Sequence, residues 1–118
     1  MAITLHAAGA RHARQLVRAG KAMFDERDAW SEDQPSAQQE NEFIRQHGMA
    51  QYGLWHLGVD DEKRPDTKGH YKFPYGDFER VHRCAVLAAE SRAGQYKYLD
   101  IELEAAHLHG MLDARLSE

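Results

Sequence analysis

The sequence predicts a mainly α-helical α+β protein in which about four helices pack around a short two-stranded β element. Three observations predict this class. Segments near both ends of the chain carry apolar residues at helical spacing. Two short central stretches, Trp55–Val59 and His70–Tyr75, alternate apolar and polar residues as strands do. The length of 118 residues suits one core, so residues 1–118 are expected to form a single domain.

The first predicted element is an amphipathic helix over residues 4–24. At about 100° per residue, apolar side chains such as Leu16 and Met23 gather on one side, and four basic side chains lie opposite. His12 lies inside the apolar stripe. We interpret it as a core histidine that is held by a hydrogen bond.

The next segment, Asp25–Pro35, has the acids, serine and proline of a connecting loop. Trp30 within this loop is expected to fold back onto the core. A second helix is predicted to begin after Ser36, because Gln39 is placed to complete a capping box, and to end at Gly48.

The two alternating stretches are predicted to pair as a hairpin. A polar loop with proline and glycine joins Trp55–Val59 to His70–Tyr75. Pro74 has no backbone N–H to donate, so it should end the second strand or confine that strand to the sheet edge.

Two further helices complete the predicted fold. Asp77 is the expected N-cap of a helix over Phe78–Ala93, and Asp100 is the expected N-cap of a helix that buries Ile101–Leu112. The short connection between them predicts an antiparallel pair. The stripe that should let the pair pack closely is made of small residues: Ala85, Ala88 and Ala89.

Composition limits the classes of function. The chain has 15 basic and 19 acidic residues and a net charge of −4, which argues against a nucleic-acid partner. No apolar run approaches the ~20 residues that span a bilayer. The single cysteine excludes an intramolecular disulfide and, with the lack of a leader segment, predicts a cytoplasmic protein. The expected partner is an unknown protein or a small polar ligand, and homo-oligomerisation is left open.

Neither a metal site nor another cofactor is predicted. His82 and Cys84 are two residues apart on a predicted helix, so their side chains should point about 200° apart. Helical ligand pairs need a spacing of three or four residues, and no recognised motif supplies it. Cys84 is therefore interpreted as inert filling rather than as a nucleophile or ligand. Whether histidines from separate segments converge on a metal is left open.

Polar residues crowd the stretch from Thr67 to Cys84 and the end of the strand before it. Strand ends hold side chains in fixed directions, so these residues are the candidate site. The candidates for acid–base catalysis are His82, Tyr75, His70, Asp60 and Asp61. The candidates for ligand binding are His56, Lys72, Tyr71 and Arg83. A suitable strand register would bring His56 beside His70 and Lys72. The alternative is that these histidines point to opposite sides or form structural hydrogen bonds.

Two functions follow from these residues. The first is a small binding or interaction module without a bound cofactor. The second is a small cofactor-free enzyme that uses acid–base chemistry on a small polar substrate. A cleft that converges on the candidate side chains would favour the enzyme.

The stretch "KGHYKFPYGDFERVHR", with its flanking residues, resembles a family of small, uncharacterised, mostly bacterial proteins with a KGxYxFPYGDFxxVHR-type motif. The resemblance extends over nearly the whole chain and implies a stand-alone protein, but no activity. A looser resemblance links Trp55–Ala93 to a segment of phage prohead protease polypeptides. That segment is not the catalytic part, and this chain has no recognisable protease triad. The likeness therefore implies a structural unit only.

Overall fold

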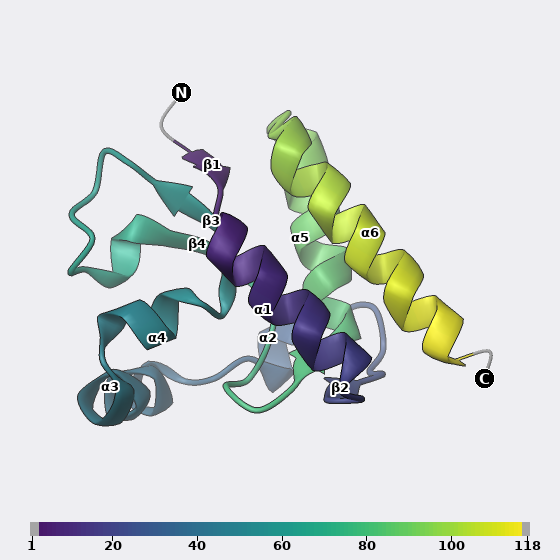
Figure 1. Ribbon diagram of the computed structural model, residues 1–118, viewed down its shortest axis with the longest axis horizontal. Coiled ribbons are helices and arrows are strands. Elements are labelled where there is room, and N and C mark those ends of the chain that lie inside the picture. The colour runs from purple at the N-terminus through teal and green to yellow at the C-terminus, as the bar shows by residue number, and fades with distance from the viewer. Residues whose placement is uncertain (1–2, 117–118) are drawn as a thin grey trace.

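The computed structural model describes residues 3–116 and has an α+β fold, as predicted (Figure 1). Within these residues it contains six α-helices and two small sheets, rather than four helices around one two-stranded element. The elements in chain order are β1 (Ile3–Leu5), α1 (Ala7–Arg18), β2 (Ala22–Met23), α2 (Trp30–Asp33), α3 (Ala37–His47), α4 (Met49–Gly53), β3 (His56–Asp60), a 3₁₀ turn (Lys68–His70), β4 (Tyr71–Pro74), β5 (Val81–His82), α5 (Arg83–Gln95) and α6 (Leu99–Leu116).

The larger sheet has three antiparallel strands in the order β1-β3-β4. The predicted hairpin is the β3–β4 pair, in which His56 lies opposite Pro74. Pro74 is the last residue of an edge strand, as expected from its missing N–H. The smaller sheet joins β2 and β5 in parallel, with Met23 opposite His82.

The predicted helix over residues 4–24 is wrong at both ends. Residues 3–5 form β1 because they pair with β3, and residues 22–23 form β2 because they pair with β5. The helix itself is limited to Ala7–Arg18. Gly20 adopts a φ of 78°, which turns the chain out of the helix and toward β5.

Helix α1 lies directly against the central strand of the larger sheet. A Cβ atom at Gly9 would collide with the carbonyl oxygen of His56, so only glycine permits this approach. The next turns bury Ala10, Ala13 and Val17. Small side chains therefore set the distance between α1 and β3.

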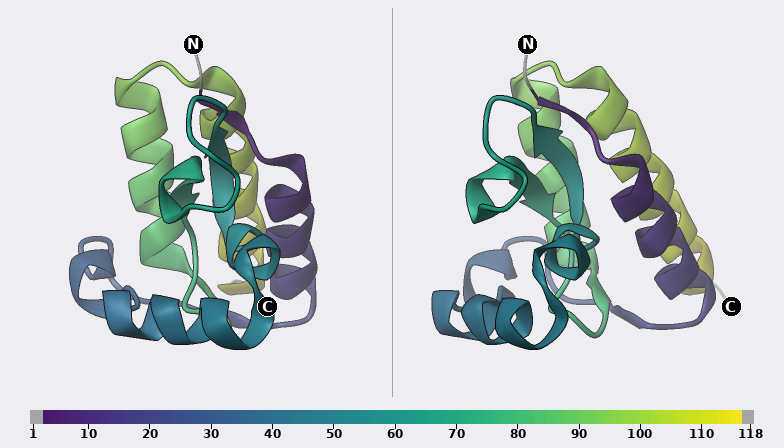
Figure 2. Two further views of the ribbon diagram at one scale, coloured as in Figure 1. Left: turned by 90° about the vertical axis from the view of Figure 1, so that its left-hand side faces the viewer. Right: turned by 60° about the vertical axis from the view of Figure 1, so that its left-hand side comes forward.

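The helices α5 and α6 form the predicted antiparallel pair, seen side by side in all views (Figures 1 and 2). The core face of α5 consists of Val86, Ala89 and Ala93, whereas Ala88 is exposed, so the predicted alanine stripe is only partly correct. The residues of α6 in the same core are Ile101, Ala105, Leu108 and Leu112.

Both predicted starts in this pair are corrected. Helix α5 begins at Arg83, and Asp77 caps a turn by accepting hydrogen bonds from the backbone N–H groups of Glu79 and Arg80. Helix α6 begins at Leu99, so Asp100 lies in its first turn.

The second predicted helix is confirmed in detail. Ser36 and Gln39 form the capping box, and Gly48 follows the last helical residue with a φ of 89°. The short helices α2 and α4 were not expected. Trp30 lies in α2 and is half-buried, with its ring 5.4 Å from that of His82. Across residues 3–116, no helix has the length and apolar character needed to cross a membrane.

The packing of α5 on α6 predicts that Ala93→Phe lowers the free energy of unfolding by about 1–3 kcal/mol, because Ala93 is fully buried in the core that the two helices share and a ring would overpack it. Urea denaturation measures the change. Ala106→Phe is the matched control. Ala106 is exposed on α6, so this substitution should lower the free energy of unfolding only by the difference in helix propensity between alanine and phenylalanine. Equal stability of the two variants would contradict the packing.

Candidate functional site

A groove of about 750 Å³ lies along α5. Its walls come from segments far apart in the sequence: the residues leading into α2 together with α2 itself, strand β4, and the connection from α5 to α6. The floor is formed by small and apolar side chains of α5: Ala85, Leu87, Ala88 and Ala89. This groove is within the size range of pockets that hold small molecules.

The rim of the groove is basic although the whole chain is acidic. Arg27, Lys72 and Arg92 line it, and the only carboxylate in its lining is Asp28. Among residues 3–116, none of these three cations forms an ion pair. The groove therefore presents unneutralised positive charge.

Aromatic rings form much of the remaining wall: Trp30, Phe73, Tyr96 and Tyr98. The ring of Phe73 packs edge-on against that of Tyr98 at 6.0 Å, and Tyr96 stacks on Tyr98 at 5.9 Å. Phe73 has a φ of 61°, and so does Lys97, which lies between the two tyrosines. A positive φ costs a non-glycine residue of order 1–3 kcal/mol, so the fold holds this wall in a strained conformation.

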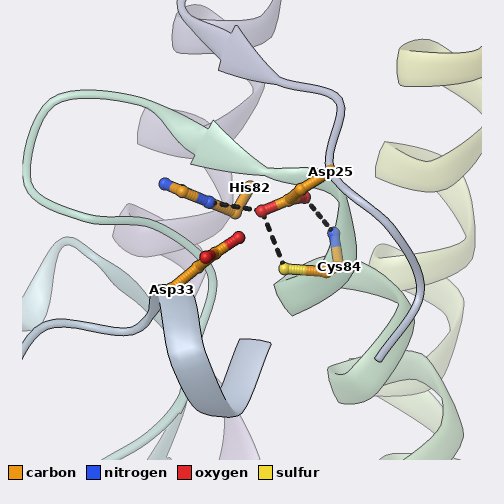
Figure 3. Close-up of side chains that lie close together, drawn as sticks. All are labelled: Asp25, Asp33, His82 and Cys84. Atoms are coloured by element: carbon orange, nitrogen blue, oxygen red, sulfur yellow. Dashed lines mark hydrogen bonds and ion pairs between the residues drawn. The ribbon is translucent and has the colours of Figure 1, made fainter. Parts of the chain in front are cut away.

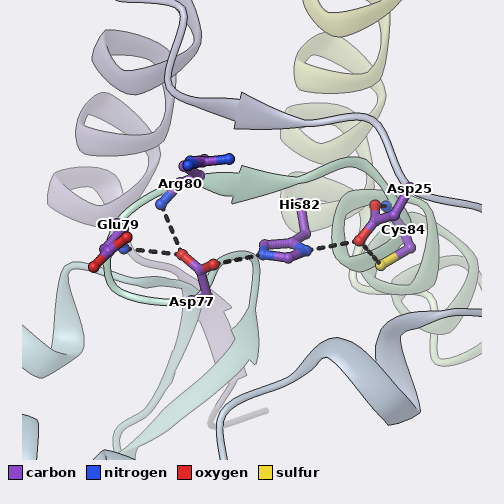
Figure 4. Close-up of polar contacts among 6 residues, drawn as sticks. All are labelled: Asp25, Asp77, Glu79, Arg80, His82 and Cys84. Carbon is purple, nitrogen blue, oxygen red and sulfur yellow. Dashed lines mark hydrogen bonds and ion pairs between the residues drawn. The ribbon is translucent and has the colours of Figure 1, made fainter.

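A second polar feature surrounds His82, which lies where β5 meets α5 and is 5% exposed (Figure 4). Its Nδ1 lies 2.7 Å from Asp25 Oδ2, and its Nε2 lies 2.8 Å from Asp77 Oδ2. Both ring nitrogens face carboxylates, and only an imidazolium can donate at both positions. The arrangement therefore holds His82 as a cation.

The pKa shifts follow from these contacts. Burial alone would lower the pKa of His82, but the hydrogen bonds to Asp77 and Asp25 outweigh burial and raise it. Burial would likewise raise the pKa of Asp25, but hydrogen bonds from Cys84 and His82 lower it to about 2. The Asp33 carboxyl hydrogen-bonds to Asp25, which raises the pKa of Asp33.

Cys84 completes this group of side chains (Figure 3). Its backbone N–H donates to Asp25 Oδ1 and its thiol donates to Asp25 Oδ2, both at 2.9 Å. The thiol is buried, and burial together with the Asp25 carboxylate raises its pKa. A protonated, buried thiol is a poor nucleophile, but its hydrogen bond to Asp25 makes Cys84 part of a polar cluster rather than the inert filling that the sequence predicted.

The predicted site residues are scattered over several environments. Among the predicted ligand-binding residues, Lys72 lines the groove. His56 is buried with its Nδ1 3.0 Å from the carbonyl oxygen of Tyr52, and His70 Nδ1 lies 3.0 Å from the carbonyl oxygen of Lys63. The structure does not gather His56, His70 and His82 into one site.

The other candidates have structural contacts. Tyr75 is fully buried, and its hydroxyl donates to the carbonyl oxygen of Leu54 and lies 2.7 Å from His12 Nδ1. His12 is thus the hydrogen-bonded histidine that the sequence predicted. Tyr71 is half-buried and packs among aromatic and imidazole rings in tilted and edge-on contacts, with His70 edge-on at 4.8 Å.

Asp60, Asp61 and Arg83 do not line the groove. Asp60 accepts a hydrogen bond from the backbone N–H of Glu62, and Asp61 is exposed in the following turn. Arg83 donates through Nε to Asp113 Oδ1 at 2.9 Å and so links α5 to α6.

The sequence did not indicate that Asp25 and Asp33 lie beside His82, or that Asp77 binds Nε2 of His82. Asp25 and Asp33 lie in a segment that the sequence predicts to be a connecting loop, and nothing local in that segment points toward His82. The missed signal is the pair of strands that flanks the group, since Met23 pairs with His82 and so carries Asp25 to the start of α5. His82 and Cys84 do not lie on opposite sides of one helix, as their spacing predicted, because His82 precedes α5.

Comparisons of the chain with family models, curated proteins and solved structures found no significant match. The resemblance to small bacterial proteins that share the KGxYxFPYGDFxxVHR-type motif therefore stays a prediction.

The buried position of His56 predicts a stability change at acidic pH. Burial, more than any other effect, lowers the pKa of His56 to about 4. The unfolded chain takes up this proton near pH ~6.5, so the folded state loses stability as the pH falls from that value to about 4. The slope contributed by His56 is up to about 1.4 kcal/mol per pH unit.

Urea unfolding across this pH range, with NMR titration of the imidazole, measures the effect. His56→Gln is the matched variant, because it cannot take up the proton and its stability should fall less steeply. An NMR pKa near ~6.5 for His56 in the folded protein would contradict the prediction.

Proposed function

We propose that the chain is a small binding module whose groove along α5 takes an anionic ligand with an apolar body. We place this module in the cytoplasm, a location that the single cysteine favours. The observation that carries the proposal is the lining of the groove, where three cations without ion-pair partners among residues 3–116 surround an aromatic and aliphatic surface.

Charge supports an anionic ligand. A protein with a net charge of −4 repels anions in general, so three cations around one groove with a single carboxylate form a local exception. Arg27 and Arg92 are exposed and lie on different segments, so a carboxylate, sulfonate or phosphate in the groove can meet guanidinium groups from both.

The rest of the lining supports an apolar body attached to the anionic group. The alanines and Leu87 on the floor offer no hydrogen bonds from their side chains, and rings stand at the walls. Flat apolar groups pack well on such surfaces, and aromatic pairs add about 0.5–1.5 kcal/mol beyond the area buried. The strained Phe73 supports the same conclusion, since strained residues cluster at ligand sites.

The geometry favours binding over the acid–base alternative. None of the five catalytic candidates lines the groove among the residues that the structure describes. His82 has both nitrogens engaged by carboxylates, and the pKa of Tyr75 is raised by burial, so neither group is poised to exchange protons with a bound substrate.

The test uses 8-anilinonaphthalene-1-sulfonate, an anionic aromatic dye whose fluorescence rises in apolar sites. We expect saturable binding to the native protein. Ala88→Trp should abolish it, because Ala88 is exposed on the groove floor and an indole there fills the space. Arg27→Gln and Arg92→Gln should each weaken binding by roughly two- to fivefold, the range that one exposed ion pair supplies.

Two controls separate the contribution of charge from non-specific hydrophobic binding of the dye. Arg11→Gln removes an exposed cation of α1 outside the groove and should leave the dye affinity unchanged. N-phenyl-1-naphthylamine carries the same rings without the sulfonate, so its affinity should respond to Ala88→Trp but not to the arginine variants. Unchanged dye affinity in a folded Ala88→Trp variant would contradict the proposal.

A further inference from the structure

Four side chains with metal-binding atoms converge beside the start of α5 (Figure 3). They are Asp25 from the segment after β2, Asp33 at the end of α2, His82 in β5 and Cys84 in the first turn of α5. One ligand atom from each residue can be chosen so that all four lie within 4.8 Å of one another.

These separations suit a tetrahedral ion after a small contraction and rearrangement. Zinc bonds nitrogen and oxygen at about 2.0–2.2 Å and sulfur at about 2.3 Å, which places its four ligands roughly 3.3–3.8 Å apart. In the structure, His82 Nδ1 and Cys84 Sγ lie 2.7 and 2.9 Å from Asp25 Oδ2 as hydrogen-bond partners. A metal ion would replace both protons and move these atoms apart by less than about 1 Å.

The chemistry of the four groups selects the metal. Imidazole, thiolate and carboxylate together are typical ligands of zinc, whereas magnesium and calcium prefer oxygen alone. All four ligand positions of a tetrahedral site would come from the protein. Such closed sites are structural rather than catalytic.

A second observation lies outside the four ligands. The far nitrogen of His82, Nε2, lies 2.8 Å from Asp77 Oδ2, and Asp77 Oδ1 is itself fixed by the backbone N–H groups of Glu79 and Arg80 at 3.0 and 2.8 Å (Figure 4). Metal-bound histidines characteristically donate their other N–H to an anchored carboxylate, which orients the ring. Because Asp77 keeps the proton on Nε2, loss of the Nδ1 proton on metal binding would leave the Nδ1 lone pair directed at the cluster.

Asp25 is also held in an orientation that directs one of its oxygens toward the cluster. The backbone N–H of Cys84 donates to Oδ1 of Asp25 at 2.9 Å, which directs Oδ2 toward His82 and the thiol. The side chains of Asp25 and His82 are 10% and 6% exposed, whereas Asp33 is exposed on the surface. An ion can therefore enter from the side of Asp33 and reach ligands that are already held in place.

We propose that Asp25, Asp33, His82 and Cys84 form a structural zinc site that fixes residues 25–33 to the start of α5. Helix α2 has no fully buried residue, so a metal bond to Asp33 would add an attachment at the end of the segment to the hydrogen bonds that Asp25 already accepts. On binding, the Cys84 thiol and the His82 imidazolium each release one proton. The site does not depend on any ligand in the groove.

The test begins with protein stripped by EDTA and kept reduced. Competition titration with a chromophoric chelator should give one Zn²⁺ per chain, and bound zinc should raise the melting temperature. Co²⁺ in place of zinc should give a thiolate-to-cobalt charge-transfer band and the strong d–d absorption of a tetrahedral site. Cys84→Ser should remove the charge-transfer band, and Asp33→Asn, at an exposed position that should still fold, should reduce the zinc affinity at least tenfold.

Asp77→Asn probes the orientation of His82 without touching a ligand, and we expect zinc affinity about 10–100-fold weaker. His109→Asn is the matched control, because His109 also lies between two carboxylates, those of Glu90 and Asp113, but outside the cluster. Zinc affinity should be unchanged in that variant. The proposal is overturned if native protein gives no charge-transfer band, or if Cys84→Ser and Asp33→Asn bind zinc as tightly as the native chain.

Discussion

One carboxylate, that of Asp25, holds the segment between β2 and α2 against the junction of β5 and α5. It accepts two hydrogen bonds from Cys84 and one from His82, and these span 57 to 59 residues of sequence. The parallel pairing of β2 with β5 is only two residues long, so by itself it does little to stabilise the position of this segment. The groove depends on this connection, because α5 forms its floor and the segment that follows Asp25 forms one wall. Moving Asp25 would therefore alter both the polar cluster and the binding surface.

The sequence predicts those elements whose cause is local. The capping box of Ser36 and Gln39 and the period-two pattern of the β3–β4 hairpin can be recognised within a few residues. Strands β1 and β2 have no such signal, because their partners lie more than fifty residues away. At Asp77 a local signal was present but had two possible meanings, a helix N-cap or a turn. Its carboxylate accepts N–H groups two and three residues later, as a helix N-cap would, but it does so in a turn.

The candidate site is less predictable than the fold, for a related reason. Lys72 was expected to bind a ligand and does line the groove, but the cations and rings around it come from four separate segments. The spacing rule for metal ligands on a helix does not apply to His82 and Cys84, because His82 lies in β5 and only Cys84 lies in α5. At a junction of strand and helix, residues two apart can point the same way, and His82 and Cys84 both do so toward Asp25.

The pairing of β1 with β3 has a consequence for synthesis on the ribosome. Ile3 pairs with Asp60, Ala22 pairs with Val81, and the backbone N–H of Leu5 donates to Asp100. Residues 3–23 leave the exit tunnel before any of these partners has emerged from it. Chains emerge at about 5–20 residues per second, so this segment waits several seconds with its apolar side chains uncovered. A chaperone that binds short apolar segments near the tunnel would therefore have several seconds in which to bind residues 3–23.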